Sequence, residues 1–120
     1  MIKNLKIIYV FLVLFFAQQA IAQQNNMLDD RSFIKCLIEA TGSKVSGDLY
    51  SADSLYKKCL ELNPKSGVVN FELSGIYLNL NQLQKALEYA NIAVAIAPDN
   101  EWYVANLALA YKENGDHKKS

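Results

Sequence analysis

The clearest pattern in the chain begins at Pro64 and ends at Pro98, in the segment PKSGVVNFELSGIYLNLNQLQKALEYANIAVAIAP. These two prolines are 34 residues apart, and the same offset relates turn residues and small residues on both sides of the segment. The matching sets are Gly47, Asn81 and Gly115; Ala40, Ser74 and Ala108; and Ala52, Ala86 and Ser120. Because several classes of residue share one period, the sequence predicts stacked supersecondary units of that length.

The segment between the prolines predicts two helices joined by a turn. Residues 67–80 follow Ser66, a good helix cap, and carry apolar side chains at three- and four-residue spacing. Asn81 indicates a left-handed turn, a conformation that favours glycine or asparagine. Residues 83–97 carry a second amphipathic pattern, which stops at Pro98 because proline cannot continue a helix.

The same layout extends to both sides of this middle unit. We assign the first unit to residues 33–66, the second to residues 67–100 and a partial third to residues 101–120. The predicted helices are residues 32–46, 49–63, 67–80, 83–97 and 101–114, with the fifth capped by Asp99 or Asn100. We therefore predict an all-α solenoid of two complete helical hairpins followed by the first helix of a third. Gly115 and His117 are expected in the turn after that helix.

This arrangement of residues resembles the tetratricopeptide repeat family. The matching positions are Leu73, Ser74, Tyr77, Ala86, Ala93 and Pro98 in the middle unit, Leu107, Ala108 and Tyr111 in the third, and Ala40, Gly47, Ala52, Tyr56, Cys59 and Pro64 in the first. Glu39 and Ser43 depart from the family pattern, where leucine and tyrosine are expected. The resemblance implies a right-handed stack whose concave face is made mainly by the first helix of each unit. It also implies binding of a protein or peptide partner.

The first residues have the order of a secretory signal peptide. Lys3 and Lys6 precede an apolar run over residues 7–17, and Ala20 and Ala22 supply the small side chains that a signal peptidase accepts. We expect residues 1–22 to be the signal peptide, cleaved after Ala22. The apolar run is shorter than the ~20 residues of a stable membrane span, so we expect no span after cleavage; a retained anchor is the alternative.

After the leader, the polar residues 23–32 are expected to be a flexible lead-in. An exported chain with the segment PDNEWY at 98–103 also resembles the repeat proteins of bacterial cell envelopes. This resemblance implies a periplasmic or cell-envelope location.

Composition excludes several functions. The chain carries twelve basic and twelve acidic residues, and loss of Lys3 and Lys6 with the leader would leave a weak negative excess. Without basic clusters there is no electrostatic footprint for nucleic acid. His117 has no second strong metal ligand at a suitable spacing, and the sequence has no Gly-rich phosphate loop or nucleophile elbow. We therefore expect a non-enzymatic protein without metal or cofactor.

Cys36 and Cys59 are the only cysteines in the chain. In the repeat register one lies early in a helix and the other late in its antiparallel partner, so we expect them to be near neighbours. Export to an oxidising compartment would permit a disulfide between them. Two buried, reduced thiols are the alternative, because helix pairs seldom bring Cβ atoms close enough for a bridge.

The resemblance places a row of largely apolar residues on the concave face of the first helices. Its positions are Leu37, Thr41, Lys44, Phe71, Gly75, Leu78, Trp102, Ala105, Leu109 and Lys112. Phe71, Leu78, Trp102 and Leu109 are the candidate partner-binding residues, since aromatic side chains bury much area with little loss of rotamer freedom. The alternative is that Trp102 and its neighbours cover adjacent helices inside the stack.

The third unit stops after its first helix, which would leave Leu107, Ala110 and Tyr111 without a covering helix. The sequence is therefore the start of a longer array, a chain that self-associates through this helix, or a marginally folded fragment. Our leading hypothesis is an exported scaffold for protein–protein interaction. An architectural or self-assembling segment of a longer repeat protein and the sensory domain of a signalling protein are the other hypotheses.

Overall fold

A computed structural model describes residues 2–119, with side chains over residues 3–116. The described residues are all-helical, as predicted. The five helices are α1 (Ile2–Val45), α2 (Leu49–Leu62), α3 (Gly67–Asn79), α4 (Leu83–Ile96) and α5 (Glu101–Lys119). By their contacts the residues form two compact units, Met1–Ser32 and Phe33–Ser120, and α1 contributes to both.

The bounds of α2, α3 and α4 agree with the predicted helices to within one residue at each end. Side-chain caps begin α2 and α3, whereas Gln82 before α4 makes no side-chain capping hydrogen bond. The Ser66 hydroxyl oxygen accepts a hydrogen bond from the Val69 N–H at the start of α3, as the sequence predicts. Asp48 caps α2 through the Ser51 N–H, and Asn100 caps α5 through the N–H groups of Trp102 and Tyr103.

The expected flexible lead-in has a helical conformation in the structure. Residues 23–32 are part of α1, and the first helix of the repeat stack therefore has no separate start near residue 32. The physical reason is the absence of a helix breaker: the first glycine of the chain is Gly42 and the first proline is Pro64. Without either residue, nothing local interrupts the backbone hydrogen bonds of the helix.

The first unit is a single helical segment whose described side chains, from Lys3 to Ser32, are all exposed. Its apolar residues are among the most exposed in the structure. By length and hydropathy, α1 is the one described helix that could cross a membrane. Signal sequences and membrane anchors both have this property.

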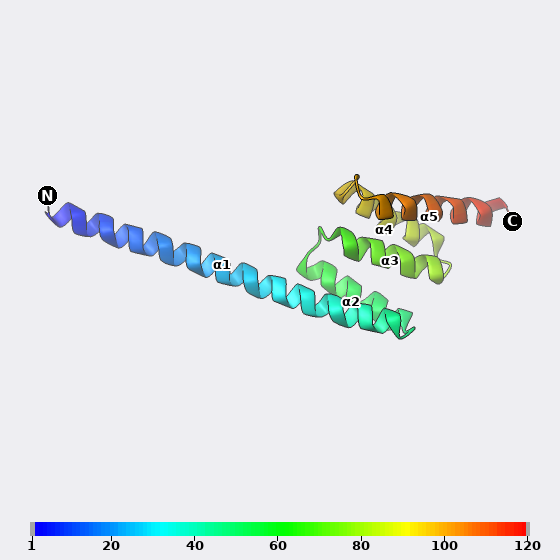
Figure 1. The fold of residues 1–120 in the computed structure, drawn as a ribbon, viewed down its shortest axis with the longest axis horizontal. Helices are drawn as coiled ribbons and strands as arrows, with labels where there is room; N and C mark the ends of the chain where they lie inside the picture. The colour runs from blue at the N-terminus through cyan, green and yellow to red at the C-terminus, as the bar shows by residue number, and fades with distance from the viewer. Residues whose placement is uncertain (1, 120) are drawn as a thin grey trace. The chain divides into compact units, whose positions relative to one another are not determined.

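In the second unit, α2, α3, α4 and α5 follow one another side by side, and α3 contacts both α2 and α4 (Figure 1). One buried cluster joins α1, α2 and α3 and includes Tyr56, Leu73 and Ile76. A second cluster joins α4 and α5 through Leu87, Ala90 and Ala110, and Leu78 packs against both clusters. Each hairpin therefore buries the apolar face of its neighbour, as a repeat stack requires.

The two inner turns repeat one backbone conformation. Gly47 has a φ of 88° and Asn81 a φ of 57°, the left-handed region that ends many helices. The Asp48 N–H donates to the Ser43 carbonyl at 2.9 Å, and one period later the Gln82 N–H donates to the Tyr77 carbonyl at 2.8 Å. The turn chemistry that the sequence predicts at these two positions is therefore present.

The predicted third turn is wrong. Gly115 and His117 lie within α5, which continues to Lys119 instead of ending near residue 114. At Gly47 and Asn81 the following helix packs back and holds the turn, whereas no helix follows Gly115 among the described residues. A glycine alone weakens a helix by only about 1 kcal/mol, so the helix continues through it.

This difference gives the same substitution opposite effects at equivalent positions. Gly47→Ala is expected to lower the free energy of unfolding by about 1 kcal/mol, because alanine is strained at positive φ. Gly115→Ala is expected to raise it by up to about 1 kcal/mol, because alanine favours the helix and its Cβ meets no atom within 4 Å. Urea unfolding of both variants measures the contrast. Equal destabilisation would mean that α5 ends at residue 115 in solution.

Candidate binding surface

The four candidate residues lie on α3 and α5 but differ in exposure. Trp102 is 78% exposed and Leu109 is 46% exposed, so both side chains are available at the surface of the second unit. Phe71 and Leu78 are half-buried. The candidate set therefore combines two surface residues on α5 with two residues on α3 that also support the stack.

Phe71 is held by an aromatic contact that the sequence analysis did not identify. Its ring lies 5.3 Å from the ring of Tyr103, centroid to centroid, with an angle of 31° between the planes. Tyr103 also fits closely against Gly67, where an added Cβ would lie 2.9 Å from Tyr103 Cε2. At the start of α3, Gly67 therefore leaves a space that the Tyr103 ring, near the start of α5, fills. This contact fixes α5 against α3 next to Trp102.

The charge of the row is smaller than its sequence indicates. The Lys44 ammonium forms an ion pair with Glu72 of α3, so one of the two lysines in the row is neutralised. The sequence analysis did not identify Glu72, which is next to Phe71 in the sequence but outside the row. Its pairing with Lys44 depends on how far one helix is shifted along the other, which the sequence does not show. The remaining basic residue of the row, Lys112, is exposed. An apolar partner segment therefore meets little uncompensated charge near Lys44.

A polar network joins α2, α3 and α4. The Tyr77 hydroxyl donates to Asp53 Oδ1 at 2.6 Å, and Lys57 Nζ donates to Asp53 Oδ2 at 3.3 Å. Lys57 and Lys85 also lie over the Tyr77 ring, which stacks on Tyr89 with the two planes 6° apart. The network ties the two hairpins together at the turn between α3 and α4.

Burial and these partners set the protonation states. Burial raises the pKa of Tyr77, and its hydrogen bond to Asp53 raises it further. Tyr77 and then Asp53 raise the pKa of Lys57, although burial acts in the opposite direction. Burial also raises the pKa of Tyr56, whose hydroxyl lies 3.0 Å from that of Thr41. The phenols therefore stay neutral and Lys57 stays cationic at neutral pH.

Ser74 connects three helices through its small side chain. Its hydroxyl donates to the Ala86 carbonyl of α4 at 2.8 Å, and it accepts a hydrogen bond from Asn106 Nδ2 of α5 at 2.9 Å. Ser74 and Ala86 are both fully buried. The two small residues therefore pack closely, and the hydrogen bonds explain why a serine is suited to this position.

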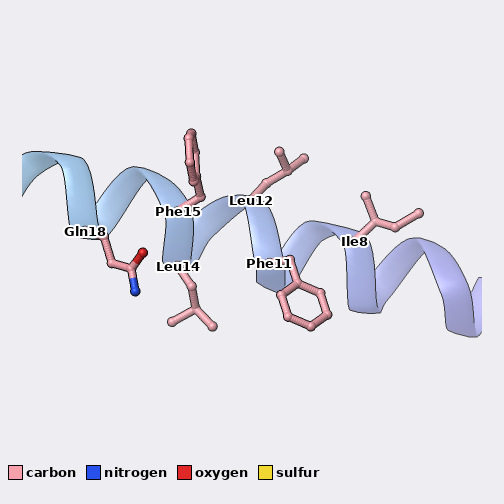
Figure 2. Close-up of a pocket in the computed structure, with 6 residues that line it drawn as sticks. All are labelled: Ile8, Phe11, Leu12, Leu14, Phe15 and Gln18. Atoms are coloured by element: carbon pink, nitrogen blue, oxygen red, sulfur yellow. The ribbon is translucent and has the colours of Figure 1, made fainter.

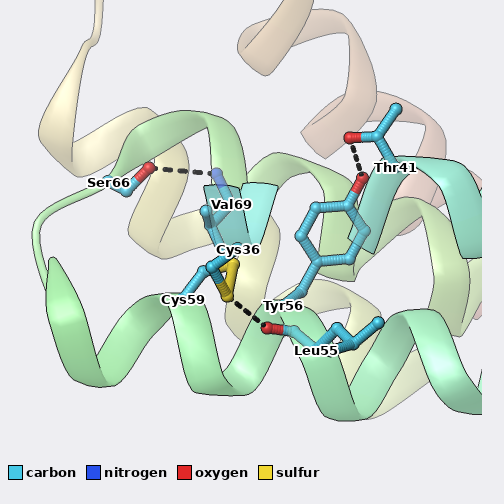
Figure 3. The surroundings of a disulfide bond; sticks show 7 residues. All are labelled: Cys36, Thr41, Leu55, Tyr56, Cys59, Ser66 and Val69. Atoms are coloured by element: carbon cyan, nitrogen blue, oxygen red, sulfur yellow. Dashed lines mark hydrogen bonds between the residues drawn. A yellow bond between two sulfur atoms is a disulfide. The ribbon is translucent and has the colours of Figure 1, made fainter. Parts of the chain in front are cut away.

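The structure brings Cys36 of α1 and Cys59 of α2 together. Their sulfur atoms are paired, and their Cα atoms are 5.7 Å apart, a separation that a disulfide spans (Figure 3). The Leu55 carbonyl oxygen lies 3.3 Å from Cys36 Sγ. A thiol at Cys36 could donate to this oxygen, whereas a disulfide sulfur carries no hydrogen. The site therefore provides a partner for the reduced form as well.

The expected uncovered side of α5 is partly wrong. Ala110 is fully buried, because it packs against Leu87 and Ala90 of α4. Leu107 is half-buried and packs against the same cluster. Tyr111 is 55% exposed, as the sequence analysis expects of a residue without a covering helix.

Comparison with known families now adds to this geometry. Residues 46–107, more than half of the chain, match the tetratricopeptide repeat. The chain belongs to the tetratricopeptide repeat family. Domains of this family are generally scaffolds for protein–protein interaction and are typically non-catalytic. None of the curated proteins matches the chain.

The match begins in the turn before α2 and ends within α5, so it includes the middle tetratricopeptide repeat entirely. In this repeat α3 is the first helix and α4 the second. The candidate residues Phe71 and Leu78 of α3 and Trp102 of α5 lie inside the matched range. Leu109 lies two residues beyond it.

The described residues offer little for ligand chemistry outside the repeats. No group of three or more His, Cys, Asp or Glu side chains among them could hold a metal ion. A further apolar surface, on the first unit, is lined by Ile8, Phe11, Leu12, Leu14, Phe15 and Gln18. Figure 2 shows these side chains projecting from one helix in different directions.

Proposed function

We propose that this tetratricopeptide repeat protein is an exported scaffold that binds a polypeptide through the apolar row on its first helices. The observation that supports this proposal best is the exposure of Trp102, 78%, beside the ordered contact between Phe71 and Tyr103. An exposed tryptophan on a rigid support loses little entropy on binding and buries a large area. Leu109, one to two turns further along α5, extends the same row.

The export part of the proposal is supported by the first unit. Its basic residues Lys3 and Lys6 precede a fully exposed apolar helix, the arrangement of a signal sequence. We propose cleavage after Ala22 and a periplasmic or cell-envelope location. The pair Cys36 and Cys59 agrees with this location, because disulfides persist in oxidising compartments. We propose that the exported protein carries this disulfide.

A second mode of binding is self-association through α5. The exposed Tyr111 supports it, together with the exposed Ala108 one turn earlier and the exposed Val104 two turns earlier. This mode does not need the row that contains Trp102. Both modes agree with a protein that binds polypeptides and carries no cofactor.

Replacement of Trp102 by alanine tests the scaffold. A cell-envelope fraction is passed over the immobilised wild-type chain, Trp102→Ala and Tyr50→Ala, and captured proteins are quantified by mass spectrometry. Tyr50 is the matched control, since it is an aromatic residue of α2 with 73% exposure. The captured amount of a specific partner is expected to fall at least about tenfold with Trp102→Ala, because tryptophan is enriched among the interface residues whose truncation costs about 2 kcal/mol or more. Tyr50→Ala should retain it.

The melting temperature separates binding from folding. Trp102→Ala is expected to leave it unchanged, because the side chain buries little area within the described structure. A lower melting temperature together with normal capture would show that Trp102 supports the stack, and would reject it as a binding residue.

A further inference from the structure

The proposed cleavage site lies in the middle of α1. This helix runs from Ile2 to Val45, and the bond between Ala22 and Gln23 is part of it. On both sides of that bond the described side chains, up to Ser32, are exposed. Cleavage would make Gln23 the first residue of the shortened helix and give it a new α-amine. Because the Gln23 side chain is exposed, packing does not prevent its amide from turning toward this amine.

A glutamine at the N-terminus of a chain can close a ring on itself. The α-amine nitrogen attacks Cδ of its own side-chain amide, the bond between Cδ and Nε2 breaks, and Nε2 leaves as ammonia with one hydrogen from the amine. The product is pyroglutamate, an uncharged five-membered lactam. The step is intramolecular and consumes no other reactant, and an α-amine is partly unprotonated near neutral pH.

The position in the chain restricts this chemistry to one residue. Gln24 follows directly and is also exposed, but its backbone nitrogen is part of a peptide bond and is not a nucleophile. Asn25 and Asn26 have the same amide one methylene closer to the backbone, a length that would require a strained four-membered ring. Among the amide residues at the start of the mature chain, Gln23 is therefore the one that can react.

The shortened helix also gains from the reaction. A terminal ammonium at the start of a helix adds positive charge to the positive end of the helix dipole. The first four residues would be Gln23, Gln24, Asn25 and Asn26, and the first acidic residue of the chain is Asp29. The first turn would thus contain no carboxylate to offset the ammonium. Closure of the lactam removes the terminal charge, as acetylation does at other N-termini.

We propose that Gln23 becomes pyroglutamate after the leader is removed, so that the exported protein has an uncharged and blocked N-terminus. The inference rests on the proposed cleavage after Ala22. It does not depend on the row around Trp102 or on the disulfide. A blocked terminus resists exopeptidases that bind a free α-amine. The segment up to Ser32 needs this protection, because its described side chains are all exposed.

The mass of the exported protein tests the proposal. The full chain with its leader is expressed in a bacterial host, recovered from the cell envelope, reduced and incubated for several days at neutral pH. Its mass gives the first residue and shows whether ammonia has been lost, and peptide mapping assigns the loss to a residue. Nearly all of the wild-type chain is expected to begin at residue 23 and to lack one ammonia at that residue.

Gln23→Asn is the matched control, because it keeps the amide and the neutral charge but cannot form the five-membered ring. The variant should keep its full mass after the same treatment. An aldehyde reagent that reacts only with α-amines should label the denatured variant and leave the denatured wild-type chain unlabelled. A wild-type chain that begins with unchanged Gln23, or that is labelled as fully as the variant, overturns this inference and leaves the cleavage proposal standing. A wild-type chain that begins at any other residue overturns both.

Discussion

Replacement of both Cys36 and Cys59 by alanine is expected to lower the free energy of unfolding of the exported protein by about 3 kcal/mol. The bond closes a loop with a sequence separation of 23 residues, and its loss lets the unfolded chain adopt many more conformations. Urea unfolding of the wild-type chain, with and without reductant, and of the double variant measures the effect.

The position of the two cysteines makes the first repeat especially dependent on this bond. Within α1, Cys36 and Ala40 are the buried residues of the described chain, with Phe33 and Leu37 packed at the edge of the core. Few apolar contacts therefore hold α1 against α2. After reduction, a Cys36 thiol would keep only a weak hydrogen bond to the Leu55 carbonyl.

The alanine double variant treated with reductant is the control. Reductant should destabilise the wild-type chain and leave the alanine double variant unchanged. Mass spectrometry of the exported protein should show a gain in mass of two hydrogen atoms on reduction, because each sulfur becomes a thiol. Free thiols in the exported protein, or a wild-type chain whose unfolding is insensitive to reductant, would contradict the proposed disulfide.

Replacement of Ala86 by leucine is expected to destabilise the protein by about 1–3 kcal/mol. Ala86 is fully buried, and its carbonyl accepts the hydrogen bond from Ser74. A leucine side chain would move α4 away from α3 and strain this bond. Because Ser74 also receives a hydrogen bond from Asn106, the effect should reach α5.

Ala95→Leu is the matched control for this second effect. Ala95 lies on the same helix and is exposed, so its replacement should change the free energy of unfolding by less than about 0.5 kcal/mol. Thermal and urea unfolding of both variants provide the comparison. Equal effects at the two positions would mean that α3 and α4 do not pack as closely as the structure has them.

The helices and inner turns could be predicted because their signals are local and recur. Pro64 and Pro98 stop two helices, and Gly47 and Asn81 supply two left-handed turns at the same offset. The third turn could not be predicted from Gly115 alone. A glycine ends a helix only where the next helix packs back, and that condition depends on tertiary contacts.

The candidate surface was less predictable than the fold. The register of the repeats predicts which helices carry it, but it does not determine side-chain partners across helices. The ion pair of Lys44 with Glu72 and the aromatic contact of Phe71 with Tyr103 both depend on how far one helix is shifted along its neighbour. For the same reason the sequence could not show that Ala110 is buried while Tyr111 is exposed.

The close fit of Tyr103 against Gly67 limits how this gene could have grown by duplication. One period earlier the two positions hold Val69 and Phe33, a medium and a large residue in the opposite order. A duplicated middle repeat inserted after itself would place a valine where the tyrosine now fills the space over the glycine. Phe71 would lose its aromatic neighbour in the same event. The repeats are thus similar in backbone but not interchangeable, and their order along the chain is fixed by their side chains.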